Sequence, residues 1–204
     1  EVLLMRREEV HASLLPESNL GMQGPMSKTV NLVVDMMNTY QHEDADILAS
    51  HVADIIDPLA RLLAEARQRD DVDLIYVNDN YGDFSAEFSD IVHAALDGAR
   101  PDLVKSIVPE KGCRVMTKVR HSAFYATSLA YLLGQLKPEQ VILTGQVTEQ
   151  CILYTALDAY VRHFPVVVPH DAVAHIDPVL GDAALKMMER NMSAKVMTAA
   201  QCLP

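Results

Sequence analysis

The 204-residue sequence is poor in the features that mark several classes of protein. Its three cysteines, Cys113, Cys151 and Cys202, are an odd number without metal-ligand spacing, so neither a disulfide framework nor a zinc site is predicted. Such cysteine usage is typical of a reducing compartment, and we expect a cytoplasmic protein.

Long apolar runs and basic clusters are also missing. No run approaches the roughly 20 apolar residues of a membrane-spanning helix, and the first ten residues lack the long apolar region of a signal peptide. Lys and Arg number 17 against 28 Asp and Glu, which gives a net charge of −11. We therefore expect neither nucleic acid nor a membrane as a partner. A nucleotide-binding protein is disfavoured because no G-x-G-x-x-G or G-K-[ST] motif follows the first strand-like run.

What the sequence does contain is a series of short apolar runs separated by helical patterns. The inner runs are rich in β-branched residues and nearly continuous, which is typical of strands covered by helices on both faces. We predict a doubly wound, three-layer α/β domain of Rossmann-like type with a six-stranded, mainly parallel sheet. The six runs are TVNLVVD, VDLIYVN, RVMTKV, QVILTG, PVVVPHD and AKVMTA.

The spacing of apolar residues between these runs predicts helices. One is expected over residues 57–70, with Pro58 at its first position, and another over residues 122–136, with Ser122 as its cap. A last helix over residues 178–192 is rich in methionine, which usually fills cores and interfaces.

The domain organisation follows from where this pattern starts. Residues 1–28 have no sustained periodicity and are interpreted as an N-terminal arm, and residues 29–204 as a single domain. The arm and the methionine-rich helix offer apolar surface, so we expect self-association to a homodimer or homotetramer.

Three reactive side chains occur at predicted strand ends. Asp35 ends the first run, Lys118 lies at the end of RVMTK, and Cys151 follows VILTG. Ligands of an open parallel sheet bind beyond the carboxyl ends of the strands. Nucleophilic catalysis could be performed by these three groups together: the acid would take the thiol proton, the ammonium would stabilise negative charge, and the thiol would attack the substrate. A helix start would lower the pKa of the thiol.

The N–H groups of Thr148 and Cys151 are candidates for an oxyanion hole.

At these residues the chain resembles the isochorismatase-like cysteine hydrolases. The resemblance rests on DMMN (35–38), KVRHSAF (118–124), GQVTEQC (145–151) and TALDAY (155–160). It implies Asp35 as acid and base, Lys118 as electrostatic partner and Cys151 as nucleophile. It also implies a non-proline cis peptide bond between Val147 and Thr148.

The resemblance is incomplete at the loop after the second run. Metal-using nicotinamidases carry an aspartate and histidines there, whereas this chain reads VNDNYGDF, with Asp79 and no histidine. We therefore expect no metal and no other cofactor. Further candidates for the substrate pocket, from their positions after the first three runs, are Asn38, Tyr40, Asn78, Asn80, Tyr81, His121 and Phe124.

The resulting hypothesis is a hydrolase that cleaves a C–N bond of a small amide, ureide or carbamoyl compound through a thioester on Cys151. Two alternatives stay open. One is hydrolysis of a vinyl ether of the isochorismatase type, which does not require the cysteine. The other is a catalytically idle binding or assembly module.

Overall fold

A single parallel sheet forms the centre of the molecule. The computed structural model describes residues 29–204, and the predicted arm of residues 1–28 lies outside the described residues. The strand order is β3-β2-β1-β4-β5-β7, with β6 paired to β4, and every pairing is parallel. The strands are β1 (Thr29–Val34), β2 (Val72–Asp79), β3 (Arg114–Lys118), β4 (Gln140–Gln146), β5 (Val166–Pro169), β6 (Val173–Ala174) and β7 (Lys195–Met197).

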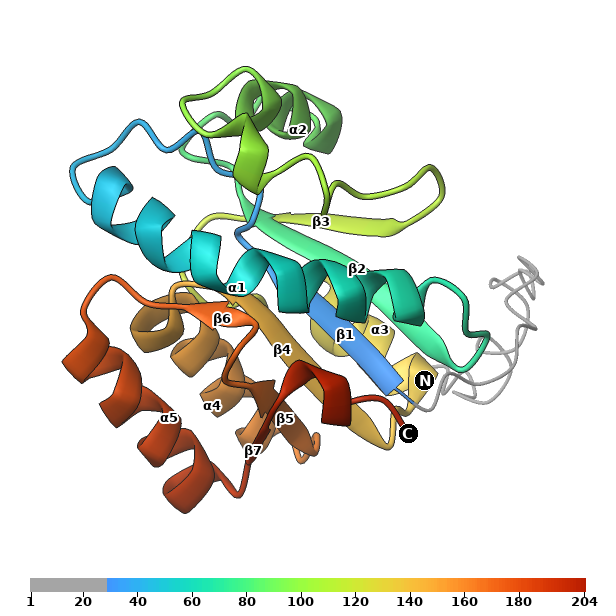
Figure 1. Cartoon of the computed structure of the whole chain (residues 1–204). Helices are drawn as coiled ribbons and strands as arrows, with labels where there is room; N and C mark the ends of the chain where they lie inside the picture. Colours follow the sequence, from blue (N-terminus) through green and yellow to red (C-terminus); the bar gives the residue numbers. More distant parts are fainter. Residues whose placement is uncertain (1–28) are drawn as a thin grey trace, which may run out of the picture.

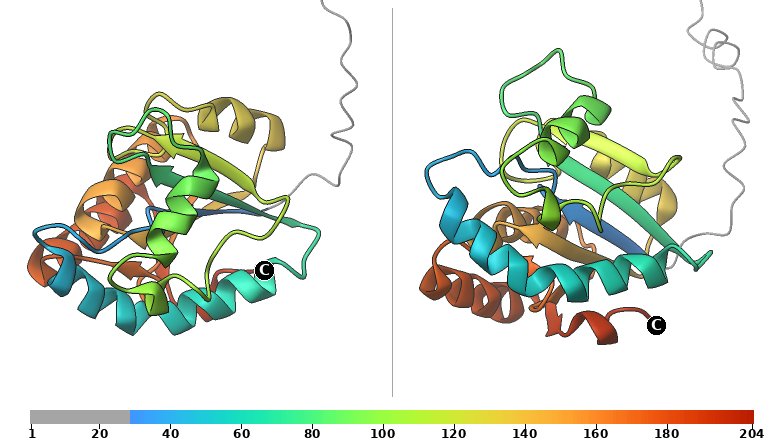
Figure 2. Two further views of the ribbon diagram at one scale, coloured as in Figure 1. Left: turned by 90° about the horizontal axis from the view of Figure 1, so that it is seen from above. Right: turned by 45° about the horizontal axis from the view of Figure 1, so that its top comes forward.

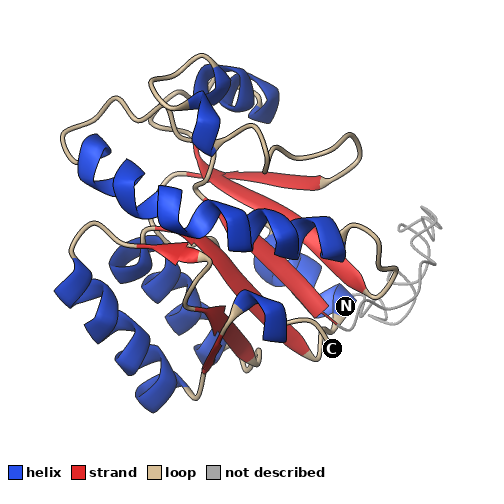
Figure 3. Ribbon diagram, in the orientation of Figure 1, coloured by secondary structure: helices blue, strands red, loops and turns tan. Residues whose placement is uncertain are grey.

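Helices cover both faces of this sheet (Figures 1 and 3). The long helix α1 crosses one face, as the right-hand view of Figure 2 also shows, and α3, α4 and α5 pack on the other. No helix within the described residues is long and apolar enough to cross a membrane. The helices are α1 (Ala45–Ala66), α2 (Phe88–Leu96), α3 (Leu129–Leu136), α4 (Leu153–Val161) and α5 (Pro178–Met192), with short turns η1 (Pro101–Leu103), η2 (Thr148–Ile152) and η3 (Ala199–Gln201).

The predicted doubly wound α/β class is confirmed, and all six predicted runs contain strands. The sheet has one strand more than predicted, because the two-residue β6 pairs with the end of β4. A strand of two residues is too short to leave a periodic signal in a sequence.

The first helix begins earlier than the sequence pattern suggested. Instead of starting at residue 57, α1 runs from Ala45 and contains Pro58 in its interior. Leu48, Val52 and Ile55 extend the buried stripe of the helix toward its N-terminus. Burial of this stripe therefore outweighs the hydrogen bond that an interior proline removes.

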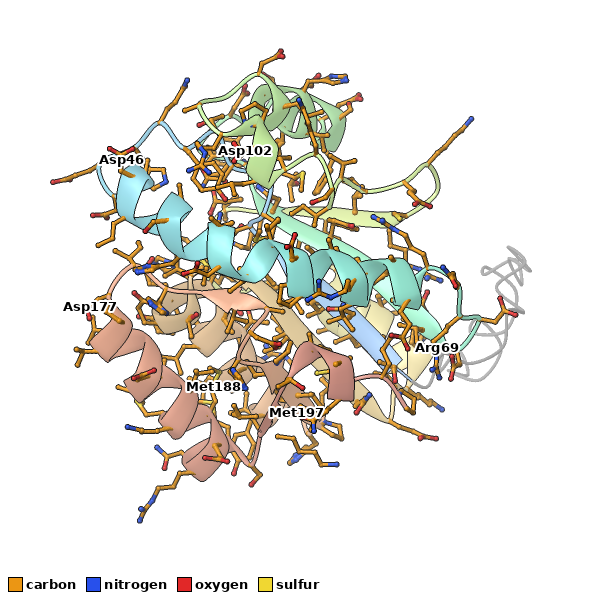
Figure 4. All side chains as sticks on the ribbon, viewed as in Figure 1. Asp46, Arg69, Asp102, Asp177, Met188 and Met197 are labelled. Carbon is orange, nitrogen blue, oxygen red and sulfur yellow. The ribbon has the colours of Figure 1, made fainter. Side chains whose placement is uncertain are left out.

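Apolar side chains fill both interfaces between the sheet and the helices. One core lies under α1 and includes Val33, Tyr76 and Ile142; the other lies under α3, α4 and α5. Met188 of α5 (Figure 4) is fully buried in the second core, whereas Met187 is exposed. The expected self-association stays a prediction.

Gly145 allows the central strands β1 and β4 to approach each other closely near their carboxyl ends. It lies in β4 opposite Val34 of β1 and has a φ of +111°. A Cβ atom placed there would come within 2.1 Å of the Val34 carbonyl oxygen. Because the backbone itself occupies this space, no side chain fits without moving β1 away from β4.

We expect Gly145→Ala to lower the free energy of unfolding by roughly 2–4 kcal/mol, because it combines a steric clash with a left-handed backbone. Urea denaturation of the wild type and the variant measures this difference. Gly134→Ala is the matched control, since nothing lies within 4 Å of a Cβ atom at that position of α3. Equal stability of the two variants would contradict the role given to Gly145.

Candidate active site

Three side chains from the carboxyl ends of nearby strands meet at one edge of the sheet. Asp35 follows β1, Lys118 ends β3, and Cys151 lies in η2 directly after β4. The Nζ atom of Lys118 is 2.8 Å from Asp35 Oδ2 and 3.7 Å from Cys151 Sγ. The structure thus brings the acid, the ammonium and the thiol into one contact cluster.

Asp35 is held through its backbone and its carboxylate. Its φ of 54° is uncommon for a residue other than glycine. The side-chain amide of Gln146 donates a 2.7 Å hydrogen bond to the Asp35 carbonyl oxygen, and the N–H of Asp79 donates one of 2.7 Å to Asp35 Oδ1. Burial raises the pKa of Asp35, although Lys118 acts in the opposite direction. A carboxyl group with a raised pKa is suited to both accept and return a proton.

Lys118 is a buried ammonium between two carboxylates. Its side chain is 0 % exposed, and Nζ contacts Asp79 Oδ2 at 3.4 Å in addition to Asp35. Burial alone would lower the pKa of Lys118, but the negative groups around it, Asp35 first, outweigh burial and raise the pKa. Lys118 therefore keeps its positive charge beside the thiol.

Cys151 lies on a π-helical turn that leads into α4. The N–H of Ile152 bonds to the Val147 carbonyl at 3.1 Å, which is the wide i to i−5 pattern. Sequence reasoning expected the helix start to lower the pKa of this thiol. The structure shows the opposite: burial raises the pKa of Cys151, Asp35 raises it further, and Lys118 opposes both. Without substrate, the proton therefore stays on sulfur near neutral pH.

The non-proline cis peptide bond within residues 29–204 lies one residue before the predicted position. It joins Gln146 to Val147, so the predicted bond between Val147 and Thr148 is wrong. The Val147 carbonyl already accepts hydrogen bonds from the first turn of η2, which makes the following peptide unit part of the helix. The change of direction after β4 consequently falls on the preceding bond. The backbone N–H of Val147 then acts on the thiol, where it lowers the pKa of Cys151 and so opposes part of the effect of burial.

Thr148 itself is buried. It lines a groove of about 460 Å³ between α1 and α5, where His51, His170 and His175 also lie. Thr148 is therefore a poorer candidate than Val147 for a donor next to the sulfur.

Among the predicted pocket residues, His121 lies nearest the thiol. Its Nδ1 atom is 3.9 Å from Cys151 Sγ, and its ring meets that of Tyr154 edge-on at 5.3 Å. His121 is exposed, so it lies at the mouth of the site. Tyr40 is buried, and its hydroxyl donates a 3.4 Å hydrogen bond to Gln146 Oε1.

The predicted asparagines make hydrogen bonds to the protein backbone. The side-chain oxygen of Asn38 accepts from the N–H of Tyr40 at 2.7 Å, and that of Asn80 accepts from the N–H of Gly82 at 3.0 Å. Asn78 bonds to both the N–H and the carbonyl of Met37, at 2.9 and 3.1 Å. These bonds shape the loops around the site. Contact of the asparagines with substrate stays a prediction.

Tyr81 and Phe124 lie in different surroundings. Tyr81 is exposed, and its hydroxyl donates a 3.0 Å hydrogen bond to the Met37 carbonyl. With Asn80 it lines a mostly apolar recess of about 340 Å³ under the loop after β2. Phe124 instead belongs to the core, where its ring stacks on that of Phe164 at 6.3 Å. Contact of either residue with substrate stays a prediction.

Comparison with known proteins agrees with this arrangement. The family model of the isochorismatase domain matches residues 29–201. This chain belongs to the isochorismatase family.

Similar proteins include one without a named activity and two that are named as amide-cleaving enzymes. The isochorismatase family protein YaaI of Bacillus subtilis is 33% identical, with 84% of this chain and 94% of that protein covered. The maleamate amidohydrolase of Pseudomonas putida is 30% identical, with 74% and 75% covered. The crystal structure of N-carbamoylsarcosine amidase from Thermoplasma acidophilum superimposes with a TM-score of 0.68 and 26% identity, covering 87% of this chain and 99% of that one. The chain is thus a member of a family of hydrolases.

The loop that carries the metal ligands in nicotinamidase members of the family has other contacts here. The Asp79 carboxylate pairs with Lys118 through Oδ2 and accepts a 2.8 Å hydrogen bond from the N–H of Tyr81 through Oδ1. Within the described part of the chain, no group of three or more His, Cys, Asp or Glu side chains is arranged to hold a metal ion. The residues present therefore do not fit the metal site of those relatives.

Two residues of the cluster were missed by sequence reasoning. Asp79 was considered only as a remnant of a metal site, although it ends β2 and so lies between the ends of β1 and β3. Gln146 ends β4 and holds Asp35. The rule that singled out Asp35 and Lys118, a polar residue at a strand end, would have found both.

Ser122 also has a role other than the predicted one. Helix α3 starts at Leu129, and Ser122 Oγ bonds to Asp158 Oδ2 of α4 at 2.5 Å. The next residue, Ala123, donates its N–H to Thr155 Oγ1 at 2.9 Å. These two bonds attach the segment after Lys118 to the helix that follows Cys151.

We expect Asp35→Asn to lower the pKa of Cys151, because it removes the negative charge of Asp35, which raises that pKa. A lower thiol pKa means more thiolate at a given pH, so alkylation by iodoacetamide near pH 7 should accelerate several-fold. Peptide mapping of alkylation across pH measures this, with Cys113 in the same sample as internal control. A profile that is unchanged or moves to higher pH would refute the coupling.

Proposed function

We propose that this protein is a cysteine hydrolase that cleaves a C–N bond of a small amide, ureide or carbamoyl compound. The observation that carries the proposal is the direct contact of Lys118 Nζ with both Asp35 Oδ2 and Cys151 Sγ, at 2.8 and 3.7 Å. A base, a fixed positive charge and a nucleophile in contact are the parts that acyl transfer through a thioester requires.

The first step is transfer of the thiol proton to Asp35. Because the pKa values of both groups are raised, the proton can move between them without creating a second buried negative charge. Lys118 stabilises the negative charge on either atom. The sulfur then attacks the substrate carbonyl carbon, and the resulting oxyanion accepts hydrogen bonds from the N–H groups of Val147 and Cys151. Val147 replaces Thr148 of the sequence-based hypothesis.

The second half of the cycle returns both protons. Asp35 gives its proton to the leaving nitrogen as the C–N bond breaks, which leaves a thioester on Cys151 and a neutral amine or ammonia. Asp35 then takes a proton from water as the water oxygen attacks the thioester carbon. Collapse of this second intermediate releases the acid, and the proton on Asp35 returns to sulfur.

The named relatives support this reaction class. One is a maleamate amidohydrolase and another an N-carbamoylsarcosine amidase, so both act on C–N bonds. The name of the family model favours a second candidate, the vinyl ether hydrolysis of an isochorismatase. A buried thiol in contact with both charged residues is not required by that reaction, which is why we prefer the amide reaction.

We expect Cys151→Ala and Asp35→Asn each to lower kcat for an amide substrate by about a thousandfold or more, and the double variant to be little worse than either. The two residues act as one unit, so their effects should not add. Turnover of maleamate and N-carbamoylsarcosine, followed by release of ammonia, provides the assay. Cys113→Ala is the control for loss of a cysteine.

The outcome also separates the alternatives. A vinyl ether hydrolase would keep most of its rate in Cys151→Ala but lose it in Asp35→Asn, and an idle module would show no turnover in the wild type. Mass spectrometry of the wild type during turnover should show an acyl group on the peptide that contains Cys151. Substantial amide hydrolysis by pure Cys151→Ala would exclude the thioester mechanism.

Turnover should also survive removal of divalent metals. The Asp79 carboxylate is engaged by Lys118 and Tyr81, and the proposed steps use only side chains and backbone N–H groups of this chain, together with water. Dialysis against a chelator, followed by assay with and without added zinc, tests this. Loss of activity that zinc restores would show that a metal takes part.

A further inference from the structure

The segment that crosses the mouth of the site differs in charge from the rest of the chain. Although the protein carries 28 Asp and Glu, residues 111–138 contain none. The same segment holds Lys118, Arg120 and His121 within four consecutive residues. A positive stretch without acidic residues, in a protein of net charge −11, lies where it contacts the proposed nucleophile.

The buried cation of this segment cannot serve a substrate anion. Lys118 is 0 % exposed and already contacts the carboxylates of both Asp35 and Asp79. Any substrate anion that approached it would add a third negative charge to a buried cluster, which is unfavourable. A negatively charged group of a substrate therefore needs another cation nearby.

Arg120, the residue before His121 in the sequence, is the candidate cation, and His121 is a candidate hydrogen-bond donor beside the thiol. His121 Nδ1 is 3.9 Å from Cys151 Sγ, and an imidazole can donate a hydrogen bond. Arg120 is exposed, and its guanidinium makes no ion pair or hydrogen bond with any residue from 29 to 204. Other arginines are engaged: Arg67, Arg69, Arg100, Arg114 and Arg162 each pair with a carboxylate.

The backbone that carries these two side chains is anchored directly afterwards. Ser122 and Ala123 bond to Asp158 and Thr155 of α4, at 2.5 and 2.9 Å. Because α4 continues from the turn that carries Cys151, the distance between this segment and the thiol is defined by hydrogen bonds on both sides. The positive segment is therefore a fixed part of the mouth.

We propose that Arg120 and His121 form an anion-binding subsite beside Cys151, and that the substrate is an amide or ureide that also carries a carboxylate. Arginine suits this role because its planar guanidinium binds a carboxylate with two parallel hydrogen bonds. The amide or ureide part of the statement rests on the proposed function; the anion-binding part does not. Maleamate and N-carbamoylsarcosine both contain a carboxylate besides the bond to be cleaved.

Two alkylating reagents of similar size test the subsite without knowledge of the substrate. Iodoacetate carries a carboxylate, whereas iodoacetamide is neutral. The rate of alkylation of Cys151 by iodoacetate, divided by its rate with iodoacetamide, therefore reports the charge at the mouth of the site. We expect Arg120→Gln to lower this ratio about fivefold relative to wild type, and Arg120→Lys to keep most of it. The wild-type ratio should fall as salt is added, because salt screens exposed charges. An unchanged ratio in Arg120→Gln would overturn the subsite.

Arg61→Gln is the matched control, since Arg61 is an exposed arginine of α1 that also makes no ion pair with a described residue. The ratio of alkylation rates in Arg61→Gln should equal that of the wild type. An equal fall in Arg61→Gln and Arg120→Gln would show a general charge effect and contradict the proposal.

The second measurement compares maleamate with its uncharged diamide as substrates. We expect kcat/KM to favour maleamate at least tenfold in the wild type, with most of that preference lost through KM in Arg120→Gln.

The two measurements separate failure of the subsite from failure of the proposed function. If the wild type hydrolyses neither compound, the amide reaction is in error, and the alkylation ratio still decides whether the mouth binds anions. If both compounds are hydrolysed equally well, the carboxylate requirement is wrong while the amide reaction stands.

Discussion

The ion pair between Lys118 and Asp35 is shielded from water, and the carboxyl ends of three adjacent strands are needed to accommodate it. Asp35 follows β1, Asp79 ends β2 and Lys118 ends β3, and these strands lie side by side in the order β3-β2-β1. A buried ammonium without partners would lose its proton. Two carboxylates keep it charged, and removal of one partner from such a pair typically costs about 3–5 kcal/mol. The parallel sheet is thus what allows a permanent charge beside the thiol.

In the proposed mechanism, that permanent charge is what would allow a thiol with a raised pKa to act as a nucleophile. A cysteine with a low pKa would be a thiolate at all times and open to oxidation and to any electrophile. Here Asp35 holds the thiol in its protonated form, and the total charge of the buried cluster is the same whether the proton is on sulfur or on Asp35. The activation that we propose is therefore an internal proton transfer, with Lys118 beside the negative charge in both states.

The fold and the clustering of the three candidate site residues could be predicted because they depend on patterns short enough to be visible in the sequence. Continuous β-branched runs indicate strands buried on both faces, and a polar residue at the end of such a run is placed at the active edge. This reasoning located Asp35, Lys118 and Cys151. It failed where the deciding contact is distant. Ser122 has the pattern of a helix cap, but its partner Asp158 is 36 residues away.

Other errors arose where the backbone geometry depends on the tertiary structure. The cis bond was placed one residue late because the end of β4 is determined by its pairing with β6 at Gln146 and Ala174, and β6 itself leaves no signal. The start of α1 was placed late because Pro58 gives a stronger local signal than the burial that overrides it. The pKa of Cys151 was expected to be lowered because the burial of the thiol and its contact with Asp35 appear only in the folded molecule.

The loop after β2 is held largely by its own short-range hydrogen bonds. Asp79 accepts from the N–H of Tyr81, Asn80 from that of Gly82, and Asp83 from those of Ser85 and Ala86. Only its first residue takes part in the charged cluster. Substitutions, insertions or exchanges beyond Asn80 can therefore alter the recess and the mouth while the ammonium, the acid and the thiol keep their spacing. The charged cluster and the loop beyond Asn80 are therefore structurally separable parts of this edge of the sheet.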